Sequence, residues 1–470
     1  MSKSEHHSQQ TRLEHDLIGE KAIPVDAYYG VQTARGMENF KISNVPISHY
    51  PDLVCAFAMV KLAAARANHE VGKLPKDILG AIEKACQDII EGNLHDQFLL
   101  DVFQGGAGTS TNMNANEVIA NRALEHLGKE KGEYQYCDPH DHVNMSQSTN
   151  DAYPSALHLA MALSNTRLIA EMKNLVGSFR KKGKEFSSIL KMARTQLQDA
   201  VPMTLGQEFE SWASSIEGEV MALERVENVL HEVNMGGTAI GTGLNAPAGF
   251  STACAKHLAT ISGKKIQLAP NLIEATQDTQ AFVLYASVLK SLAIKLSKIC
   301  NDLRLLSSGP RAGLAEIFLP AMQPGSSIMP GKVNPVIPEV VNQVCYRVIG
   351  NDLVVTLAAE AGQLQLNAME PVIALAILES QMLFMNGAKT LREFCIDGIK
   401  ANEKALREYL ERSIGVVTAL NPVIGYEKST ELAAEALRTG KGIVELVREK
   451  KLLSEEQLKK VLDPRAMTGA

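Results

Sequence analysis

The residue types most capable of chemistry in this chain lie together in residues 325–335, which read GSSIMPGKVNP. This stretch joins two serines, one lysine and one asparagine to flexible glycines, just before a segment with a helical pattern. A loop of this composition can close over a small molecule, exclude water and deliver a catalytic group. A hydroxyl acts as a base only when it is ionised, so such a loop would have to stabilise an alkoxide. The alternative, a loop that only leads into the helix, is nearly as well supported by these residues alone.

Three further segments place uncharged hydrogen-bond donors beside expected helix starts. They are residues 105–114, 146–151 and 194–199. Backbone N–H groups and hydroxyls at helix N-termini can hold an anion, and Thr109 is one such hydroxyl. Serine, threonine and asparagine in these places are more often plain N-caps, so each segment is a weak signal when taken alone.

Two other motifs suggest cofactors but lack the required context. Residues 236–243, GGTAIGTG, are expected to follow a helix rather than a strand, which argues against a dinucleotide loop. Residues 138–142, DPHDH, have metal-ligand residue types but neither the i, i+4 histidine spacing nor a partner cluster. We therefore expect no metal and no obligatory cofactor, and regard 138–142 as a solvated or anion-contacting loop.

Long helices must position these segments. Apolar residues recur every three or four positions over 157–179 and 209–233, as one buried helical stripe requires. Residues 271–308 contain neither glycine nor proline and would form a helix of about 57 Å. Residues 336–361 and 368–399 complete a set of five long helices, which is typical of a helical bundle.

The fold class that follows is all-α, in three domains. Residues 1–144 mix shorter helices with Gly-rich turns, residues 145–400 carry the long-helix bundle, and residues 401–470 form a small helical domain. In the last domain, Ser454 and Gln457 fit a capping box, and Asp463-Pro464 ends the helix.

Composition excludes several classes of function. Of 470 residues, 45% are hydrophobic and 21% charged, as in an ordinary globular protein. A net charge of -6 provides no basic field for nucleic acid. The polar N-terminus lacks the apolar core of a signal peptide, and no stretch has eighteen consecutive apolar residues, so we expect a cytoplasmic protein with a frayed N-terminus and no membrane association. Seven scattered cysteines without a C-x-x-C pair are expected to be buried thiols.

Taken in order, these segments resemble the aspartase/fumarase superfamily from Arg12 to about Pro464. The serine loop is the most specific part, and residues 15–20, 26–30, 147–154 and 335–344 are most similar to the aspartase branch. The resemblance implies a three-domain subunit whose five central helices join a twenty-helix core in a homotetramer. It also implies that each active site is assembled from three subunits.

The resemblance further implies a lyase that forms fumarate, and it assigns roles to individual residues. Ser326 matches the base that removes the C3 proton, and Lys332 and Asn334 match a carboxylate-binding pair. Removing that proton creates an enediolate-like dianion, which fixed donors would stabilise. The other implied substrate contacts are Thr109, Ser148, Thr149, Asn150, Thr195, Gln196 and Ser327.

Gln196 distinguishes between two reactions of this superfamily. Fumarase-like members usually have a histidine at this position, whereas glutamine cannot donate a proton at neutral pH. Loss of hydroxide from malate needs an acid, but an ammonium group leaves as neutral ammonia. We therefore expect reversible anti elimination of ammonium from L-aspartate, with Asn150 and Thr195 suited to hold that ammonium group. The alternatives are hydration of fumarate to L-malate, as in class II fumarase, and a catalytically silent scaffold, against which the intact serine loop counts.

Overall fold

A computed structural model describes residues 10–463 and 467–468, so the expected frayed N-terminus and Pro464 fall outside the described residues. The chain divides into two compact units. Unit 1 comprises residues 1–168, 222–290 and 347–382, and unit 2 comprises residues 169–221, 291–346 and 383–470. This division cuts across the long helices, and the three sequence-based domains remain predictions.

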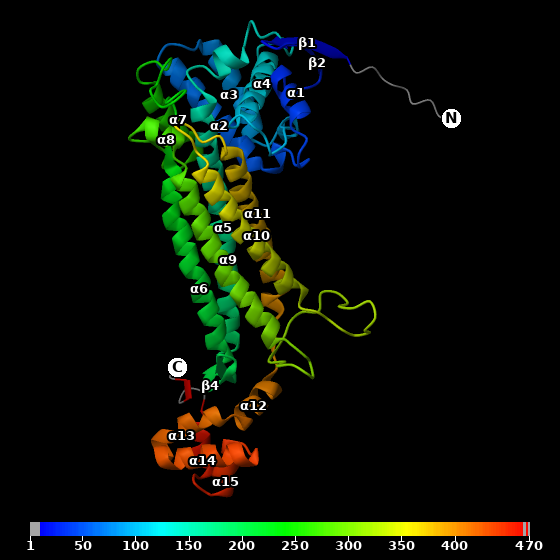
Figure 1. Cartoon of the computed structure of the whole chain (residues 1–470), viewed down its shortest axis with the longest axis vertical. Helices are drawn as coiled ribbons and strands as arrows, with labels where there is room; N and C mark the ends of the chain where they lie inside the picture. The colour runs from blue at the N-terminus through cyan, green and yellow to red at the C-terminus, as the bar shows by residue number, and fades with distance from the viewer. Residues whose placement is uncertain (1–9, 464–466, 469–470) are drawn as a thin grey trace, which may run out of the picture. The chain divides into compact units, whose positions relative to one another are not determined.

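The predicted mainly helical fold is confirmed, and five long helices each contribute residues to both units (Figure 1). The strands of the described chain form only two-stranded sheets. The long helices are α5 (Thr149–Glu185), α6 (Leu205–Val226), α9 (Gln280–Leu306), α10 (Val336–Glu360) and α11 (Glu370–Phe394).

The expected continuous helix over 271–308 is wrong, because the segment forms α8 (Leu272–Gln277) and α9 with a break between them. The carboxylate of Asp278 accepts the backbone N–H of Gln280 at 3.0 Å. Aspartate side chains compete in this way with the helical hydrogen-bond ladder, so a helix can break without glycine or proline. Similarly, α6 ends at Val226 and a 3-10 helix follows over Glu227–His231, so the end of the 209–233 stripe lies outside α6.

Unit 1 is built around α2 (Pro51–Glu70), a helix that is buried along most of its length. It packs against α3 (Lys76–Ile90), α4 (Thr109–His126) and α7 (Phe250–Ser262). Parts of the long helices are joined in the same unit by buried polar contacts. Tyr285 on α9 donates its hydroxyl to Asn165 on α5 at 2.8 Å and accepts from Gln381 on α11 at 2.6 Å.

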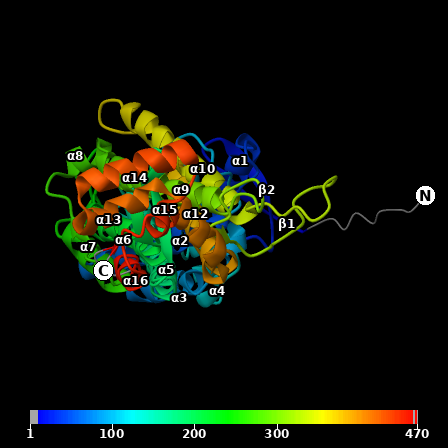
Figure 2. The same cartoon turned by 90° about the horizontal axis from the view of Figure 1, so that it is seen from below.

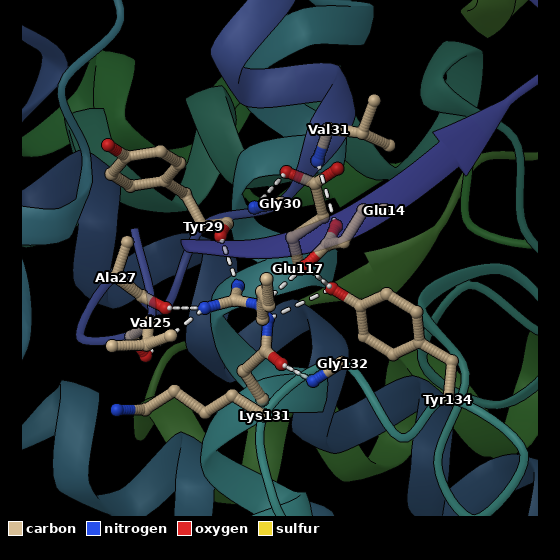
Figure 3. A network of polar contacts seen from close by, with 12 residues as sticks. Glu14, Val25, Ala27, Tyr29, Gly30, Val31, Glu117, Lys131, Gly132 and Tyr134 are labelled. Carbon is tan, nitrogen blue, oxygen red and sulfur yellow. Dashed lines mark hydrogen bonds and ion pairs between the residues drawn. The ribbon is translucent and has the colours of Figure 1, made fainter. Parts of the chain in front are cut away.

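Two buried carboxylates fix the start of α1 (Val31–Asn39) in unit 1 (Figure 3). Glu117 on α4 accepts the backbone N–H of Gly30 at 2.8 Å. Glu14 on β1 (Thr11–Asp16) accepts the N–H of Val31 at 2.9 Å and also binds Arg12 at 2.8 Å. Anionic acceptors are favourable at a helix N-terminus, although burial still raises the pKa of Glu117 to about 7. The hairpin of β1 and β2 (Gly19–Pro24), α1 and α4 are thereby held together.

Unit 2 ends in a cluster of short helices (Figure 2). This cluster packs on a hairpin. The hairpin is β3 (Leu190–Thr195) and β4 (Gln198–Thr204), and Met192 on β3 belongs to the apolar core beneath the helices. The predicted capping box of Ser454 and Gln457 is confirmed. The helices are α12 (Glu403–Arg412), α13 (Val417–Ile424), α14 (Tyr426–Thr439), α15 (Ile443–Glu449) and α16 (Glu455–Val461).

The cysteines agree with the expectation of buried thiols. All seven are free, and only Cys55 is partly exposed. Burial raises the pKa of Cys137, Cys345 and Cys395 to about 12, so these groups stay protonated at neutral pH.

One helical stretch of the described chain, residues 370–398, is long and apolar enough to cross a membrane by length and composition. Its most apolar window is 61% buried inside the protein. Core helices of soluble proteins pass the same test, so this stretch is weak evidence for a membrane span.

Candidate active site

The ten residues singled out by sequence belong to both units. Thr109, Ser148, Thr149 and Asn150 lie in unit 1. Thr195, Gln196, Ser326, Ser327, Lys332 and Asn334 lie in unit 2. Within unit 1 the structure brings the predicted residues to the starts of two helices, and within unit 2 it places them on a hairpin turn and a long loop.

Thr109 is the first residue of α4 and follows a tight glycine turn. Gly106 and Gly108 have φ of +84° and +86°, a region that L side chains rarely adopt. A Cβ on Gly108 would also lie 2.3 Å from the ring of Tyr153, which is buried on α5. The Thr109 hydroxyl is exposed and donates to Gly106 O at 2.8 Å. The turn therefore presents Thr109 at a positively polarised helix end.

Ser148, Thr149 and Asn150 form the start of α5. Ser148 Oγ accepts the N–H of Asn150 at 3.2 Å, while Asp151 accepts the N–H of Ser148 at 2.9 Å. This reciprocal arrangement is a helix cap, so the plain structural role considered for Ser148 is real. Ser148 also lines a cavity of about 420 Å³. Ser148 therefore both caps α5 and lines a cavity.

Asp151 links the start of α5 to the glycine loop 236–243 through its carboxylate. Its other carboxylate oxygen accepts the N–H groups of Gly236 at 3.0 Å and Thr238 at 2.9 Å. Burial raises the pKa of Asp151 to about 6, while the three backbone donors favour its charged form. The glycine loop 236–243 therefore supports the start of α5, and Asn150 returns the contact by donating to Ala239 O at 2.7 Å.

Contrary to the sequence-based expectation, the glycine loop 236–243 does not directly follow a helix. The loop 236–243 follows β5 (Glu232–Val233), a two-residue strand, rather than a helix directly. The next helix, α7, begins only at Phe250, so the strand, loop and helix are not contiguous. The phosphate-binding geometry of a dinucleotide fold requires that contiguity.

Lys61 on α2 is a buried charge that the sequence argument missed. Its ammonium donates to the side-chain oxygens of Asn112 at 2.7 Å, Gln147 at 2.9 Å and Asn144 at 3.0 Å. Burial lowers the pKa of Lys61 to about 7, and the nearby charge of Asp151 opposes that shift. A single lysine inside the apolar run of residues 53–65 was the signal that could have revealed it.

In unit 2, Thr195 ends β3 and Gln196 begins the turn to β4. Gln196 and Leu197 have φ of +53° and +64°, so the two-residue turn is of type I′. Such turns prefer Asn-Gly, and residues held here against preference often have a functional reason. Thr195 and Gln196 are both exposed.

A buried ion cluster holds β3 in place behind that turn. Glu316 is fully buried and pairs with Lys191 at 2.9 Å and with Arg194. Lys191 also pairs with Glu208 on α6 at 2.5 Å. Breaking a buried ion pair leaves an uncompensated charge, so this cluster strongly constrains the backbone next to Thr195.

The Ser326 hydroxyl lies in a loop that folds back on itself. Its oxygen accepts the backbone N–H groups of Met329 at 2.9 Å and Ile328 at 3.2 Å. The loop is closed by Gly325 N–H, which donates to Lys332 O at 2.6 Å. Two fixed N–H donors on one oxygen are the arrangement that stabilises negative charge there. The two donors lie two and three positions after Ser326, as in a serine turn.

The other predicted residues of the loop differ in whether their side chains are bonded within the loop. Asn334 donates its amide to Gly325 O at 2.7 Å, so this side chain helps to close the loop. Lys332 and Ser327 are exposed. No hydrogen bond or ion pair within the described residues joins the Ser326 loop to Thr195 or Gln196.

Two remaining features lie away from these residues. Asp138 caps the π-helix Pro139–Val143 by accepting the N–H groups of His140 at 2.7 Å and Asp141 at 2.8 Å. A cavity of about 900 Å³ lies in unit 1 near β1, α1 and this π-helix. None of the ten predicted residues lines it.

Two family models match most of the chain. A model described as Lyase matches residues 19–350, and one described as Fumarase C C-terminus matches residues 416–469. The first match includes every predicted site residue.

Known proteins with similar sequences and structures agree with those matches. An aspartate ammonia-lyase from Pseudomonas aeruginosa is 58% identical, covering 97% of each chain. A solved fumarate lyase:delta crystallin from Brucella melitensis is 55% identical with a TM-score of 0.93, covering 97% of this chain and 99% of that one. A class II fumarase from Schistosoma mansoni is 33% identical with a TM-score of 0.89, again covering 97% of this chain and 99% of that one.

Proposed function

Because the chain belongs to the aspartase/fumarase superfamily, we propose that it is an aspartate ammonia-lyase, which converts L-aspartate reversibly to fumarate and ammonia. Curated aspartate ammonia-lyases resemble it over nearly the full length of both chains. The class II fumarase shares the fold at lower identity, which makes hydration of fumarate the weaker alternative.

The observation that carries the mechanism is the pair of backbone N–H groups on Ser326 Oγ. In the proposed reaction, the Ser326 alkoxide removes a proton from C3 of aspartate, and the electrons collect on the adjacent carboxylate. The C2–N bond then breaks on the opposite face, ammonia leaves, and the C2=C3 double bond of fumarate forms. Ionising a serine hydroxyl costs free energy. The two N–H donors offset more of that cost than water alone would, so Ser326 can act as an alkoxide.

The substrate's two carboxylates need fixed positive partners. Lys332 and Asn334 are proposed to hold the carboxylate that gains charge, with Ser327 adding a hydrogen bond. Thr109 and the Ser148–Thr149 pair lie at the positively polarised starts of α4 and α5, which suits them to carboxylate oxygens.

Asn150 and Thr195 are proposed to bind the leaving amino group by hydrogen bonds in the site that the assembled subunits share. Gln196 stands beside Thr195 on an exposed turn and offers no proton to a departing hydroxide. Elimination of ammonia needs no such proton, because the ammonium nitrogen departs neutral. The same reasoning means that no cofactor is required in the proposal. A cytoplasmic location is part of the proposal as well, since seven free thiols suit a reducing compartment.

We also propose a homotetramer in which three subunits complete each site. On α10, Tyr346, Leu353 and Leu357 are between 57% and 61% exposed and follow one another at intervals of seven and four. These intervals put them on one face of the helix, and an apolar helix face of this kind is suited to packing against another copy. The mass in solution should be four times 51.0 kDa. A fully active monomer would contradict a shared site.

The function is tested by following the ultraviolet absorbance of fumarate with two substrates. Purified protein should form fumarate from L-aspartate, without added metal, and little or none from L-malate. Fumarate from malate with none from aspartate would replace the proposal with the fumarase alternative.

A further inference from the structure

The buried ammonium of Lys61 has a definite hydrogen-bond polarity. An ammonium has three donors and no acceptor, and the three contacts of Lys61 are all side-chain amide oxygens. The side chain is fully buried on α2, so water does not share these contacts. Each amide must therefore turn its oxygen toward Lys61 and its NH₂ group away.

The contact with Lys61 fixes the orientation of the Asn112 amide relative to the candidate site. Because Asn112 Oδ1 faces Lys61, the Nδ2 of this amide is turned away and donates to Thr149 Oγ1 and to Asn144 Oδ1, each at 3.2 Å. Asn112 is 1% exposed on α4, so the amide cannot turn over without losing the bond to the ammonium. The chain of donors runs from Lys61 through Asn112 to Thr149.

The consequence for Thr149 is that its hydroxyl oxygen already accepts a hydrogen bond. A hydroxyl has one hydrogen, and within the described chain Thr149 Oγ1 donates to no other group. Its hydrogen is left for an acceptor outside the protein. An anionic oxygen is the acceptor that this arrangement favours.

We propose that Lys61 is a positioning residue that acts through Asn112 to aim the Thr149 hydroxyl hydrogen at a carboxylate oxygen of the substrate. The proposal rests on the proposed function, in which Thr149 contacts the substrate. Lys61 touches neither the substrate nor the reacting atoms. Lys61 determines that Asn112 is the donor, and Thr149 Oγ1 the acceptor, in the hydrogen bond between these two residues.

The main test is a double-mutant cycle with Lys61→Met and Thr149→Val, read as kcat/KM for L-aspartate. Lys61→Met should lower kcat/KM about 100-fold, the size expected when a remote change misplaces a substrate-binding group. In the Thr149→Val background, Lys61→Met should cause almost no further loss, because the relay already lacks its last member. Lys182→Met is the matched control. It removes another buried lysine, one that contacts Ile399 O and Glu185, and should leave kcat/KM nearly unchanged.

A second variant separates the relay from a purely structural role. Asn112→Asp keeps an acceptor for Lys61 and adds an ion pair, which offsets the lost hydrogen bond to Asn144 Oδ1, so the protein should denature near the wild-type temperature. The introduced carboxylate cannot donate to Thr149 and would instead accept its hydroxyl hydrogen. The variant should therefore be folded yet lose kcat/KM to the same extent as Thr149→Val.

The outcomes distinguish this inference from the proposed function. Additive losses in the cycle, or an Asn112→Asp variant with nearly wild-type kcat/KM, would overturn the relay while leaving the lyase assignment intact. Wild-type protein that forms no fumarate from aspartate would overturn the proposed function and the relay together. Equal, non-additive losses with a retained denaturation temperature for Asn112→Asp would support the relay.

Discussion

Two glycines in the turn before Thr109 offer a matched test of how the unit 1 part of the site is built. Gly106 and Gly108 have nearly the same φ, +84° and +86°. Replacing either with alanine imposes the same left-handed strain, about 1–2 kcal/mol. The surroundings differ, because a Cβ on Gly106 would be at an ordinary 3.9 Å from Thr109, whereas one on Gly108 would be 2.3 Å from the Tyr153 ring.

The contact with the Tyr153 ring sets the expected difference in stability between the two variants. The Tyr153 ring is buried and cannot move aside freely, so overpacking adds about 1–3 kcal/mol to Gly108→Ala alone. Gly106→Ala should thus cost about 1–2 kcal/mol, and Gly108→Ala about 2–5 kcal/mol. Since Gly108 is the N-cap of α4, its displacement should also move Thr109 and lower kcat/KM for aspartate.

Both variants would be compared by chemical denaturation and by the fumarate absorbance assay. We expect Gly108→Ala to be the less stable and the less active of the two variants. Equal destabilisation would show that φ alone constrains this turn. Full activity of Gly108→Ala would refute the view that the turn aims Thr109.

Three further changes test other parts of the structure. Burial raises the pKa of Glu370 from 4.5 to about 8, so the free energy of unfolding should fall as pH rises from about 5 to 8. Glu370→Gln should flatten that pH dependence and add up to about 4 kcal/mol to the free energy of unfolding at pH 8, and an unchanged slope in denaturation curves would argue against this role of Glu370. Leu197→Gly should relieve the +64° turn and stabilise the protein by about 0.5–1 kcal/mol, whereas a lower melting temperature would mean that this exposed side chain is packed in the assembly. Asp151→Asn should destabilise by about 1–3 kcal/mol because its amide cannot accept all three backbone N–H groups, and unchanged denaturation would contradict the anchoring role.

Periodicity and motif spacing predicted the long helices well, because apolar stripes and helix starts are local properties. The 157–179 stripe lies entirely within α5, and the start of α10 at Val336 directly follows the serine loop, as expected. The failure at Asp278 is instructive, since one side chain taking a backbone N–H ended a helix that composition alone would have continued.

The candidate site was predictable only where its chemistry lies in one short segment. Residues 325–334 indicated a loop able to hold an activated hydroxyl, and the two N–H donors on Ser326 Oγ fit that expectation. Lys61 was missed because its meaning depends on Asn112 and Gln147, which are 51 and 86 positions away along the chain. Long-range contacts of this kind leave no mark in local spacing.

Turnover of L-aspartate by Ser326→Ala tests whether the Ser326 oxygen is the base. Ser287→Ala replaces a half-buried serine on α9 whose hydroxyl donates to Leu284 O in the same helix, and it serves as the matched control. We expect Ser326→Ala to lose at least about a thousandfold in kcat while binding of aspartate, measured by calorimetry, stays within about fivefold of wild type. Turnover by Ser326→Ala close to that of the Ser287→Ala control would refute Ser326 as the base.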